Sequence, residues 1–278
     1  VREGYHDFRI EPGGLVVYPR LVAAEHRTAF ARELVRSGLP ALDTLLGGGL
    51  SRGTSTLFLG PAGSGKSSLA TQYVRAGVAR GEHAVMFLFD ESIATFVERS
   101  SGLGFDVAPL IDSERLMVRQ IDPAELSPGA FAQMVRTTVA QRQTRMVVID
   151  SLNGYLQAMP SEKLLLLHLH ELLSYLGLQG VTTIMLMAQH GLVASFEAPV
   201  DTSYLADTVV LLRFFEVTGR VQMAISVMKK RTGSHERTIR EVRLEDGTLA
   251  IGEPIEGFLG VLTGTPRIVT PREAAERA

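Results

Sequence analysis

The sequence contains no cysteine. Disulfide bonds, thiolate metal sites and cysteine nucleophiles are therefore excluded, and this absence suits a reducing cytoplasm. An excess of charge is lacking too: 28 Lys and Arg residues against 30 Asp and Glu leave a formal net charge of −2, which gives no general attraction to nucleic acid or to an anionic membrane. The most apolar stretch, residues 164–176, contains His168, His170 and Glu171 and is too short to span a bilayer. We expect a cytoplasmic protein without a membrane partner.

The strongest pattern in the sequence is a phosphate-binding loop. Gly60 and Gly65 frame four residues and are followed by Lys66 and Ser67, which is the spacing G-x-x-x-x-G-K-[ST]. An apolar run before the loop predicts a buried strand, and apolar residues at helical spacing after it predict a helix. Lys66 is expected to reach the β- and γ-phosphates of a nucleoside triphosphate, and the Ser67 hydroxyl to hold Mg²⁺. The predicted nucleotide-binding residues are Gly60, Pro61, Ala62, Gly63, Ser64, Gly65, Lys66, Ser67 and Ser68.

The order of apolar segments predicts an α/β fold. Strands are expected over residues 54–59, 84–89, 146–149 and 183–188, with helical patterns between them. This alternation is typical of a mostly parallel, twisted sheet with helices on both faces. Beyond Thr208 the pattern changes to successive strands with short turns, which predicts an antiparallel C-terminal edge. Residues 21–36 are expected to form an amphipathic helix, and residues 265–278 a flexible tail.

The first twenty residues resemble a later part of the same chain. Residues 6–17 align without a gap with residues 240–251, and both segments show an alternating strand, a Glu-x-Gly turn and a second short strand. Arg, Glu, Gly and Leu recur at matching positions. We interpret residues 1–20 as the last hairpin of a preceding copy of the same domain.

Polar side chains follow several of the predicted strands, at the edge where open parallel sheets bind their ligands. Asp150 stands at the position where a carboxylate holds Mg²⁺ beside Ser67. Asp90 and Glu91 end another strand, and a carboxylate there can orient or deprotonate the attacking water. The sequence does not choose between these two acids. Gln189 is expected either to sense the γ-phosphate or to cap its strand.

The densest basic stretch contains Lys229, Lys230, Arg231, His235, Arg237, Arg240 and Arg243. Three interpretations are open: a solvated surface, a track for nucleic-acid phosphates, or cations offered to a nucleotide on a neighbouring subunit. Acidic residues interrupt the stretch and no aromatic side chain is interleaved for base stacking, which argues against nucleic acid.

Several segments together resemble the RecA-type ATPases, and within these the KaiC circadian-clock ATPases. The RecA-like segments are 37–43, 45–50, 60–68, Asp90-Glu91 and 147–151, and the KaiC-like segments are 206–212, 228–231 and 235–241. The resemblance runs from residue 36 to 268 and is to the second of two tandem KaiC domains. It implies a RecA-like P-loop ATPase domain over 37–264, after a linker at 21–36, that binds ATP and Mg²⁺ between the subunits of a homohexamer.

The resemblance also assigns roles to single residues. Lys229 and Arg231 would reach the phosphates held by the neighbouring subunit. Asp90 and Glu91 would match a pair of catalytic glutamates, the first shortened here by one methylene group. The Ser-Thr pair that accepts phosphate in the family corresponds to Ser203 and Tyr204, so Ser203 remains a candidate phosphoacceptor. We expect slow ATP hydrolysis at subunit interfaces, serine/threonine autokinase activity in clock-like or stress signalling, and clock or signalling proteins as partners. The alternatives are a RecA/RadA-type DNA repair ATPase and an ATP-dependent assembly scaffold.

Overall fold

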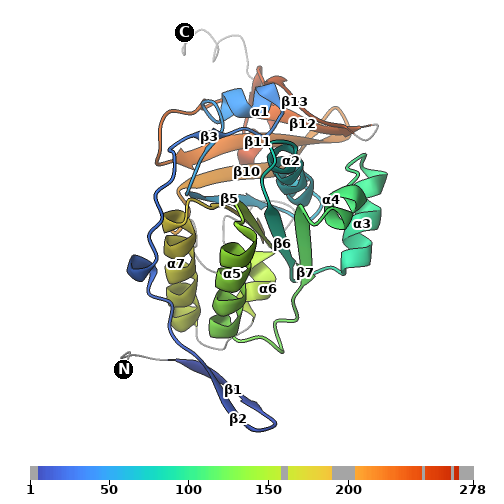
Figure 1. The fold of residues 1–278 in the computed structure, drawn as a ribbon. Helices are drawn as coiled ribbons and strands as arrows, with labels where there is room; N and C mark the ends of the chain where they lie inside the picture. Colours follow the sequence, from blue (N-terminus) through green and yellow to red (C-terminus); the bar gives the residue numbers. More distant parts are fainter. Residues whose placement is uncertain (1–5, 158–161, 190–203, 246–247, 264–265, 269–278) are drawn as a thin grey trace.

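A nine-stranded sheet forms the centre of the molecule (Figure 1). The computed structural model describes residues 6–157, 162–189, 204–245, 248–263 and 266–268. The strand order is β13-β12-β11-β10-β5-β9-β8-β6-β7. In chain order the strands are β5 (Ser55–Gly60), β6 (Ala84–Leu88), β7 (Leu116–Gln120), β8 (Met146–Asp150), β9 (Thr182–Ala188), β10 (Thr208–Val217), β11 (Arg220–Lys230), β12 (Arg240–Glu245) and β13 (Thr248–Pro254). Pairs from β10 through β7 are parallel and pairs from β10 to β13 are antiparallel, which confirms the predicted fold class.

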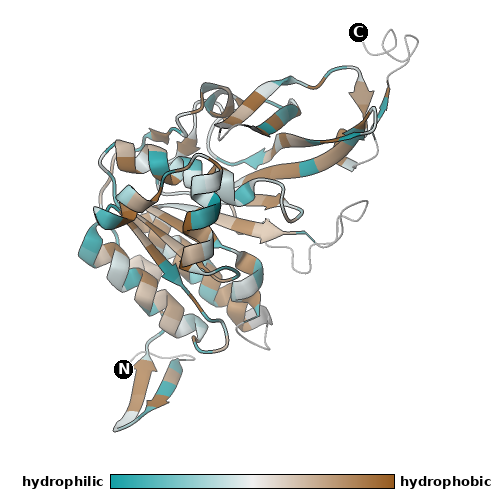
Figure 2. Cartoon of the chain, turned by 90° about the vertical axis from the view of Figure 1, so that its right-hand side faces the viewer, coloured by the Kyte–Doolittle hydropathy of each residue, from teal (hydrophilic) through white to brown (hydrophobic). Residues whose placement is uncertain are grey.

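Helices cover both faces of this sheet (Figure 1). One face carries α1 (Pro40–Leu45), α2 (Lys66–Ala79), α3 (Ile93–Gly102) and α4 (Ala108–Asp112), and the other carries α5 (Pro128–Arg142), α6 (Leu152–Leu156) and α7 (Glu162–Leu178). Strand residues alternate between the two buried clusters, as the pleat requires: Met86 packs on the α2 side, and Val85 and Phe87 pack on the α5 side. In Figure 2 the central strands are apolar along their length, as expected for strands buried on both faces.

Within the described part of the chain, no helix is long and apolar enough to cross a membrane.

The prediction of a helix over 21–36 is wrong. This segment, which we call the strap, is extended apart from a 3₁₀ turn, η1 (Ala23–Glu25), and ends in the short strand β3 (Leu34–Val35), paired with β4 (Leu50–Ser51). The Phe30 ring fills a slot whose walls are Gly53 and Gly180, where an added Cβ would lie 2.6 and 2.5 Å from the ring. Contacts with distant segments therefore override a weak local periodicity.

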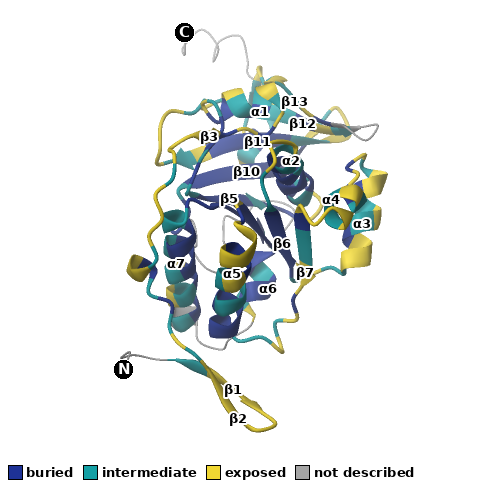
Figure 3. Cartoon of the chain, viewed as in Figure 1, coloured by how far each residue is buried: buried dark blue, intermediate teal, exposed yellow. Residues whose placement is uncertain are grey.

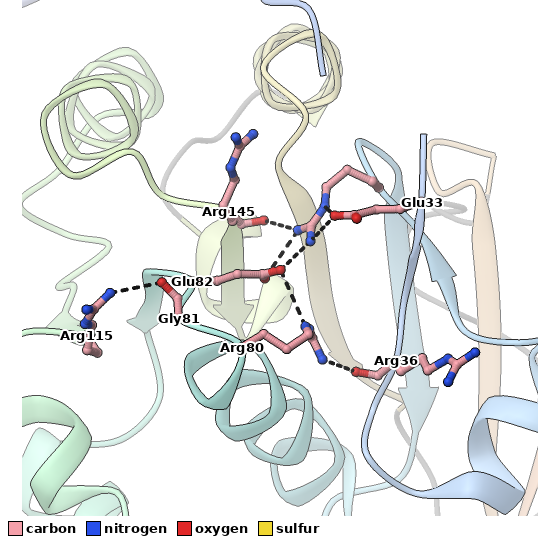
Figure 4. A network of polar contacts seen from close by, with 8 residues as sticks. Glu33, Arg36, Arg80, Gly81, Glu82, Arg115 and Arg145 are labelled. Atoms are coloured by element: carbon pink, nitrogen blue, oxygen red, sulfur yellow. Dashed lines mark hydrogen bonds and ion pairs between the residues drawn. The ribbon is translucent and has the colours of Figure 1, made fainter. Parts of the chain in front are cut away.

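An ion-pair network fastens the strap to the end of α2 (Figure 4). The buried Arg52 side chain donates to Glu33 of the strap at 2.9 Å and to Glu82, just beyond α2, at 2.5 Å. A third bond runs from Arg52 to the Arg145 carbonyl at 3.3 Å. Arg80, which directly follows α2, donates to the Arg36 carbonyl of the strap at 2.8 Å. The phosphate-loop helix is thus anchored to the strap at its far end.

The N-terminal residues form the expected hairpin of β1 (Asp7–Glu11) and β2 (Gly14–Tyr18). Its register repeats that of β12–β13: the pairs Phe8↔Val17 and Ile10↔Leu15 correspond to Val242↔Ile251 and Leu244↔Leu249. The two hairpins differ in burial, because β12 and β13 are strands of the nine-stranded sheet whereas β1–β2 extends from the body of the molecule (Figure 3). The remaining described elements, β14 (Phe258–Leu259), η2 (Val261–Thr263) and β15 (Arg267–Ile268), lie near the C-terminus.

Candidate nucleotide-binding site

The predicted phosphate loop connects the end of β5 to the start of α2, in the strand–loop–helix setting that the sequence indicates. Gly60 packs so closely on β10 that an added Cβ would lie 2.5 Å from the Leu212 carbonyl oxygen. Gly63 and Gly65 have φ angles of +78° and +83°, a conformation that glycine adopts without strain. These glycines let the loop wrap its N–H groups around a phosphate at the N-terminus of α2.

Lys66 is buried at the centre of the loop, with 8% of its surface exposed. Its Nζ donates to the carbonyl oxygens of Gly60 at 2.8 Å and Pro61 at 2.6 Å. Burial lowers the pKa of Lys66 to about 8, although the nearby charge of Asp150 acts in the opposite direction. The loop therefore holds a desolvated cation where a phosphate would bind.

Asp150 ends β8, with only β9 between β8 and the loop strand β5. The pKa of Asp150 is raised to about 6, mainly by burial. A hydrogen bond from Ser67 and the charge of Arg99 act to lower this pKa, and the charges of Glu91 and Asp90 act to raise it. Its Oδ2 atom is buried without a hydrogen-bond partner. A buried, unsatisfied carboxylate oxygen next to a serine hydroxyl fits a magnesium ion held jointly by Ser67, Asp150 and phosphate oxygens. Among the described residues no cluster of three or more His, Asp or Glu could hold a metal ion.

Asp90 and Glu91 follow β6 and have different partners. Asp90 accepts a hydrogen bond from the Ser151 hydroxyl and lies against Gly154 of α6. Glu91 forms a bidentate ion pair with Arg99 of α3, with distances of 2.6 Å to one guanidinium NH₂ group and 3.3 Å to Nε. Our sequence reasoning missed both Ser151 and Arg99. Ser151 could have been found from its place beside Asp150, whereas Arg99 gives no local signal.

Gln189 lies at the same edge of the sheet. Its backbone N–H donates to the Gly60 carbonyl at 3.1 Å, and its side chain is buried with no hydrogen-bond partner for Oε1. Beside it, Asn153 of α6 holds the end of β9 through two bonds to the Ala188 backbone, at 2.7 and 3.0 Å. Of this side chain only the amide NH₂ group could donate to a phosphate oxygen, because Oε1 is an acceptor.

Lys229 and Arg231 lie at the opposite end of the sheet from the phosphate loop. Lys229 donates to the Ala206 carbonyl at 2.8 Å, and Arg231 to the Tyr204 carbonyl at 2.8 Å. Backbone bonds link Arg231 to Asp207 and Asp207 to Ser55, the first residue of β5. Gly60 follows Ser55 by five residues along β5, which is roughly 17 Å at about 3.3 Å per residue.

A cavity of about 980 Å³ lies beside Arg231, and Arg27 and Arg32 of the strap also line it. The predicted phosphoacceptor, Ser203, lies outside the described residues. Its neighbour Tyr204 is 51% exposed.

Comparison with known proteins supplies the family. The family model described as the KaiC ATPase matches residues 35–256. The chain belongs to the KaiC family of ATPases. It is 27% identical over 270 residues to circadian clock protein KaiC3 of Synechocystis sp., covering 96% of this chain and 53% of that protein. It is 25% identical over 280 residues to circadian clock oscillator protein KaiC of Picosynechococcus sp., covering 99% and 53%.

A third relative, circadian clock protein KaiC2 of Synechocystis sp., is 27% identical over 268 residues, covering 95% of this chain and 46% of that protein. The chain thus spans about half the length of the curated relatives it matches. The predicted family membership is confirmed, and with it the RecA-like class of the fold.

Proposed function

We propose that this KaiC-family domain binds Mg²⁺–ATP in the loop 60–68 and hydrolyses it at an interface between two copies of the chain. Lys66 binds the β- and γ-phosphates, while Ser67 and Asp150 hold the magnesium ion. The ion, when bound, neutralises charge that develops on the phosphate oxygens. Lys229 and Arg231 of a neighbouring copy complete the site as an arginine finger does.

The position of Lys229 and Arg231 carries this proposal. Lys229 lies at the end of β11 and Arg231 directly follows this strand. Both cations are at the end of the strands opposite the phosphate loop of their own chain. If one end of a protomer contacts the other end of the next, the interface is heterologous. Such an interface gives a closed ring when repeating the rotation between neighbouring protomers returns to the first one. We propose a homohexamer, the ring size that the family resemblance implies.

Glu91 is the better candidate for the general base. Asp90 lies against α6, on the opposite face of the sheet from α2, and accepts a bond from Ser151 there, whereas Glu91 pairs with Arg99 of α3, on the same face as α2. In this role Glu91 accepts a proton from the water that attacks the γ-phosphate.

The repeated hairpin bears on the limits of the domain. We propose that residues 37–264 form the ATPase domain, with residues 21–36 as a linker and 1–20 as the final hairpin of a preceding domain of the same kind. The shared register of the two hairpins supports this. Ser203 is proposed as a phosphate acceptor in an autokinase reaction, for which mass spectrometry after incubation with Mg²⁺–ATP is the direct assay.

The basic stretch favours the interface over nucleic acid. Arg240 pairs with Glu236 at 2.9 Å, and Arg243 pairs with Glu241. Lys230 donates to the carbonyl oxygens of Leu46 and Gly49. Because intramolecular partners already engage these cations, few remain for a DNA backbone.

Subunit mixing tests the shared site. The Lys66→Met variant lacks a working loop but keeps Arg231, and the Arg231→Ala variant has the reverse defect. Each alone should hydrolyse ATP roughly 10³-fold more slowly than the native protein. An equal, randomly assembled mixture should recover about a quarter of the native rate, since half the loops are intact and half of their neighbours carry Arg231.

Two controls complete this test. Native protein mixed with each variant shows whether subunits exchange, and light scattering measures assembly. An Arg231→Ala variant as fast as the native protein would refute the trans site. A mixture that co-assembles without recovering activity would refute it equally.

A further inference from the structure

Arg99 engages both oxygens of the proposed general base. It lies eight residues after Glu91, on the α3 helix, and its two contacts use Nε and one NH₂ group. This fork-to-carboxylate geometry is the strongest form of a side-chain ion pair. Both charges also act on the pKa of Asp150, Glu91 raising it and Arg99 lowering it. The pair therefore lies within electrostatic reach of the proposed magnesium site.

A rigid element holds Arg99 in place. Ser92 caps the N-terminus of α3 by accepting the Thr95 N–H at 3.1 Å. The Arg99 guanidinium lies 5.6 Å from the centre of the Phe96 ring, and Phe96 is fully buried. Movement of the Glu91 side chain is therefore the easier way to open the pair.

A carboxylate bound in this way is a poor general base. Proton abstraction requires a lone pair directed at the attacking water, within about 2.6–3.2 Å. The guanidinium N–H groups occupy a lone pair on each Glu91 oxygen. The pair is nevertheless partly open to solvent, with 20% of the Glu91 side chain and 31% of the Arg99 side chain exposed. Solvent screening makes such a pair weak enough to open during turnover.

We propose that Arg99 is a positioning residue that restrains ATP hydrolysis by holding Glu91 in an ion pair, and that turnover requires Glu91 to leave this pair. This inference rests on the proposed function, in which Glu91 is the base. It predicts that the domain is slowed by one of its own side chains, in addition to any dependence on the subunit interface.

The test is single-turnover hydrolysis at saturating Mg²⁺–ATP in the assembled protein. Replacing Arg99 by Ala should raise the rate about 1.5- to 5-fold, the range expected for freeing a partly exposed pair. The KM for ATP should change less than about twofold, because Arg99 makes no contact in the phosphate loop. Arg99→Lys keeps the charge but loses the fork, so its rate should lie between those of Arg99→Ala and the native protein.

Arg75→Ala is the matched control. Arg75 of α2 also lies over a buried ring, 5.3 Å from the centre of Phe105, but it has no contact with Glu91. Its rate should equal that of the native protein. A thermal shift with Mg²⁺–ATP confirms folding and nucleotide binding for every variant, and Arg99→Lys replaces Arg99→Ala as the test if the latter does not fold.

Glu91→Gln separates this inference from the proposed function. If Glu91 is the base, Glu91→Gln is inactive and the double variant Arg99→Ala/Glu91→Gln gains nothing over it. Substantial activity in Glu91→Gln would refute the proposed base itself. An inactive Glu91→Gln together with an Arg99→Ala rate equal to or below the native rate would refute the restraint and leave the proposed function standing.

Discussion

Replacing Lys66 by methionine should stabilise the protein while abolishing its response to ATP. Burial lowers the pKa of Lys66 from 10.5 to about 8. At 1.36 kcal/mol per pKa unit, keeping this ammonium charged in the folded protein costs about 3 kcal/mol. Because the folded pKa lies below the unfolded one, the cost is fully present below pH 8 and disappears above pH 10.5. The phosphate loop is destabilised at neutral pH by its own cation.

The contacts around Lys66 indicate that its removal leaves few unsatisfied groups. The Gly60 carbonyl also accepts the Gln189 N–H, and the Pro61 carbonyl also accepts the Ser64 hydroxyl at 2.8 Å. A methionine side chain fills a similar volume without a charge. Allowing for two lost hydrogen bonds at about 0.5–1.5 kcal/mol each, we expect a gain of up to about 2 kcal/mol in the free energy of unfolding.

Urea unfolding of the nucleotide-free protein at pH 7 measures this gain, and the same measurement at pH 10 tests its origin. The advantage of Lys66→Met should shrink at pH 10, where the native lysine is largely neutral in the folded protein. The native protein should also unfold at higher temperature with Mg²⁺–ATP, whereas the variant should show no shift. A variant less stable than the native protein, or an advantage independent of pH, would contradict the reasoning.

Two further predictions concern buried charges. Burial raises the pKa of Asp150 from 3.8 to about 6, so its contribution to stability is fully present below pH 3.8 and is lost as the pH rises through 6. Relative to Asp150→Asn, the native protein should lose about 2 kcal/mol between pH 4 and pH 7, and a constant difference in urea unfolding would contradict this. Arg52→Met should cost about 2–4 kcal/mol because it leaves Glu82, whose side chain is only 15% exposed, without its main partner. Glu33→Gln should cost less than about 1 kcal/mol, because the Glu33 side chain is 57% exposed, and equal losses for the two variants would refute this account of the network.

The parallel core and the loop could be predicted because their signals are local. A strand buried on both faces needs a continuous apolar run, and the run ending at Ile149 has no polar interruption before Asp150. The loop needs glycine at fixed spacing for reasons of backbone conformation alone. The edge strand β7 was missed because Leu116 is its only fully buried residue, so it has no long apolar run and no clear alternation.

The strap and the Arg99 partner of Glu91 could not be predicted, because their causes depend on how distant segments pack. The extended path of residues 21–36 depends on a ring seated between glycines at 53 and 180. The ion pair of Glu91 depends on where α3 lies once the sheet has formed. The expected helix failed for the same reason: Leu34 is 47% exposed and pairs with Ser51 in the extended strand β3.

Both halves of the proposed site are incomplete within one protomer, in physically different ways. At the loop, Lys66 and Asp150 have pKa values displaced toward neutrality by burial, so each gains when a ligand of opposite charge arrives. At the other end of the sheet Arg231 is 51% exposed and held by Asp207 at 3.5 Å, a weak pair that a phosphate could replace. If one nucleotide satisfies both ends, ATP binding and protomer association are thermodynamically linked. The factor by which ATP tightens assembly must then equal the factor by which assembly tightens ATP binding, since the coupling is reciprocal.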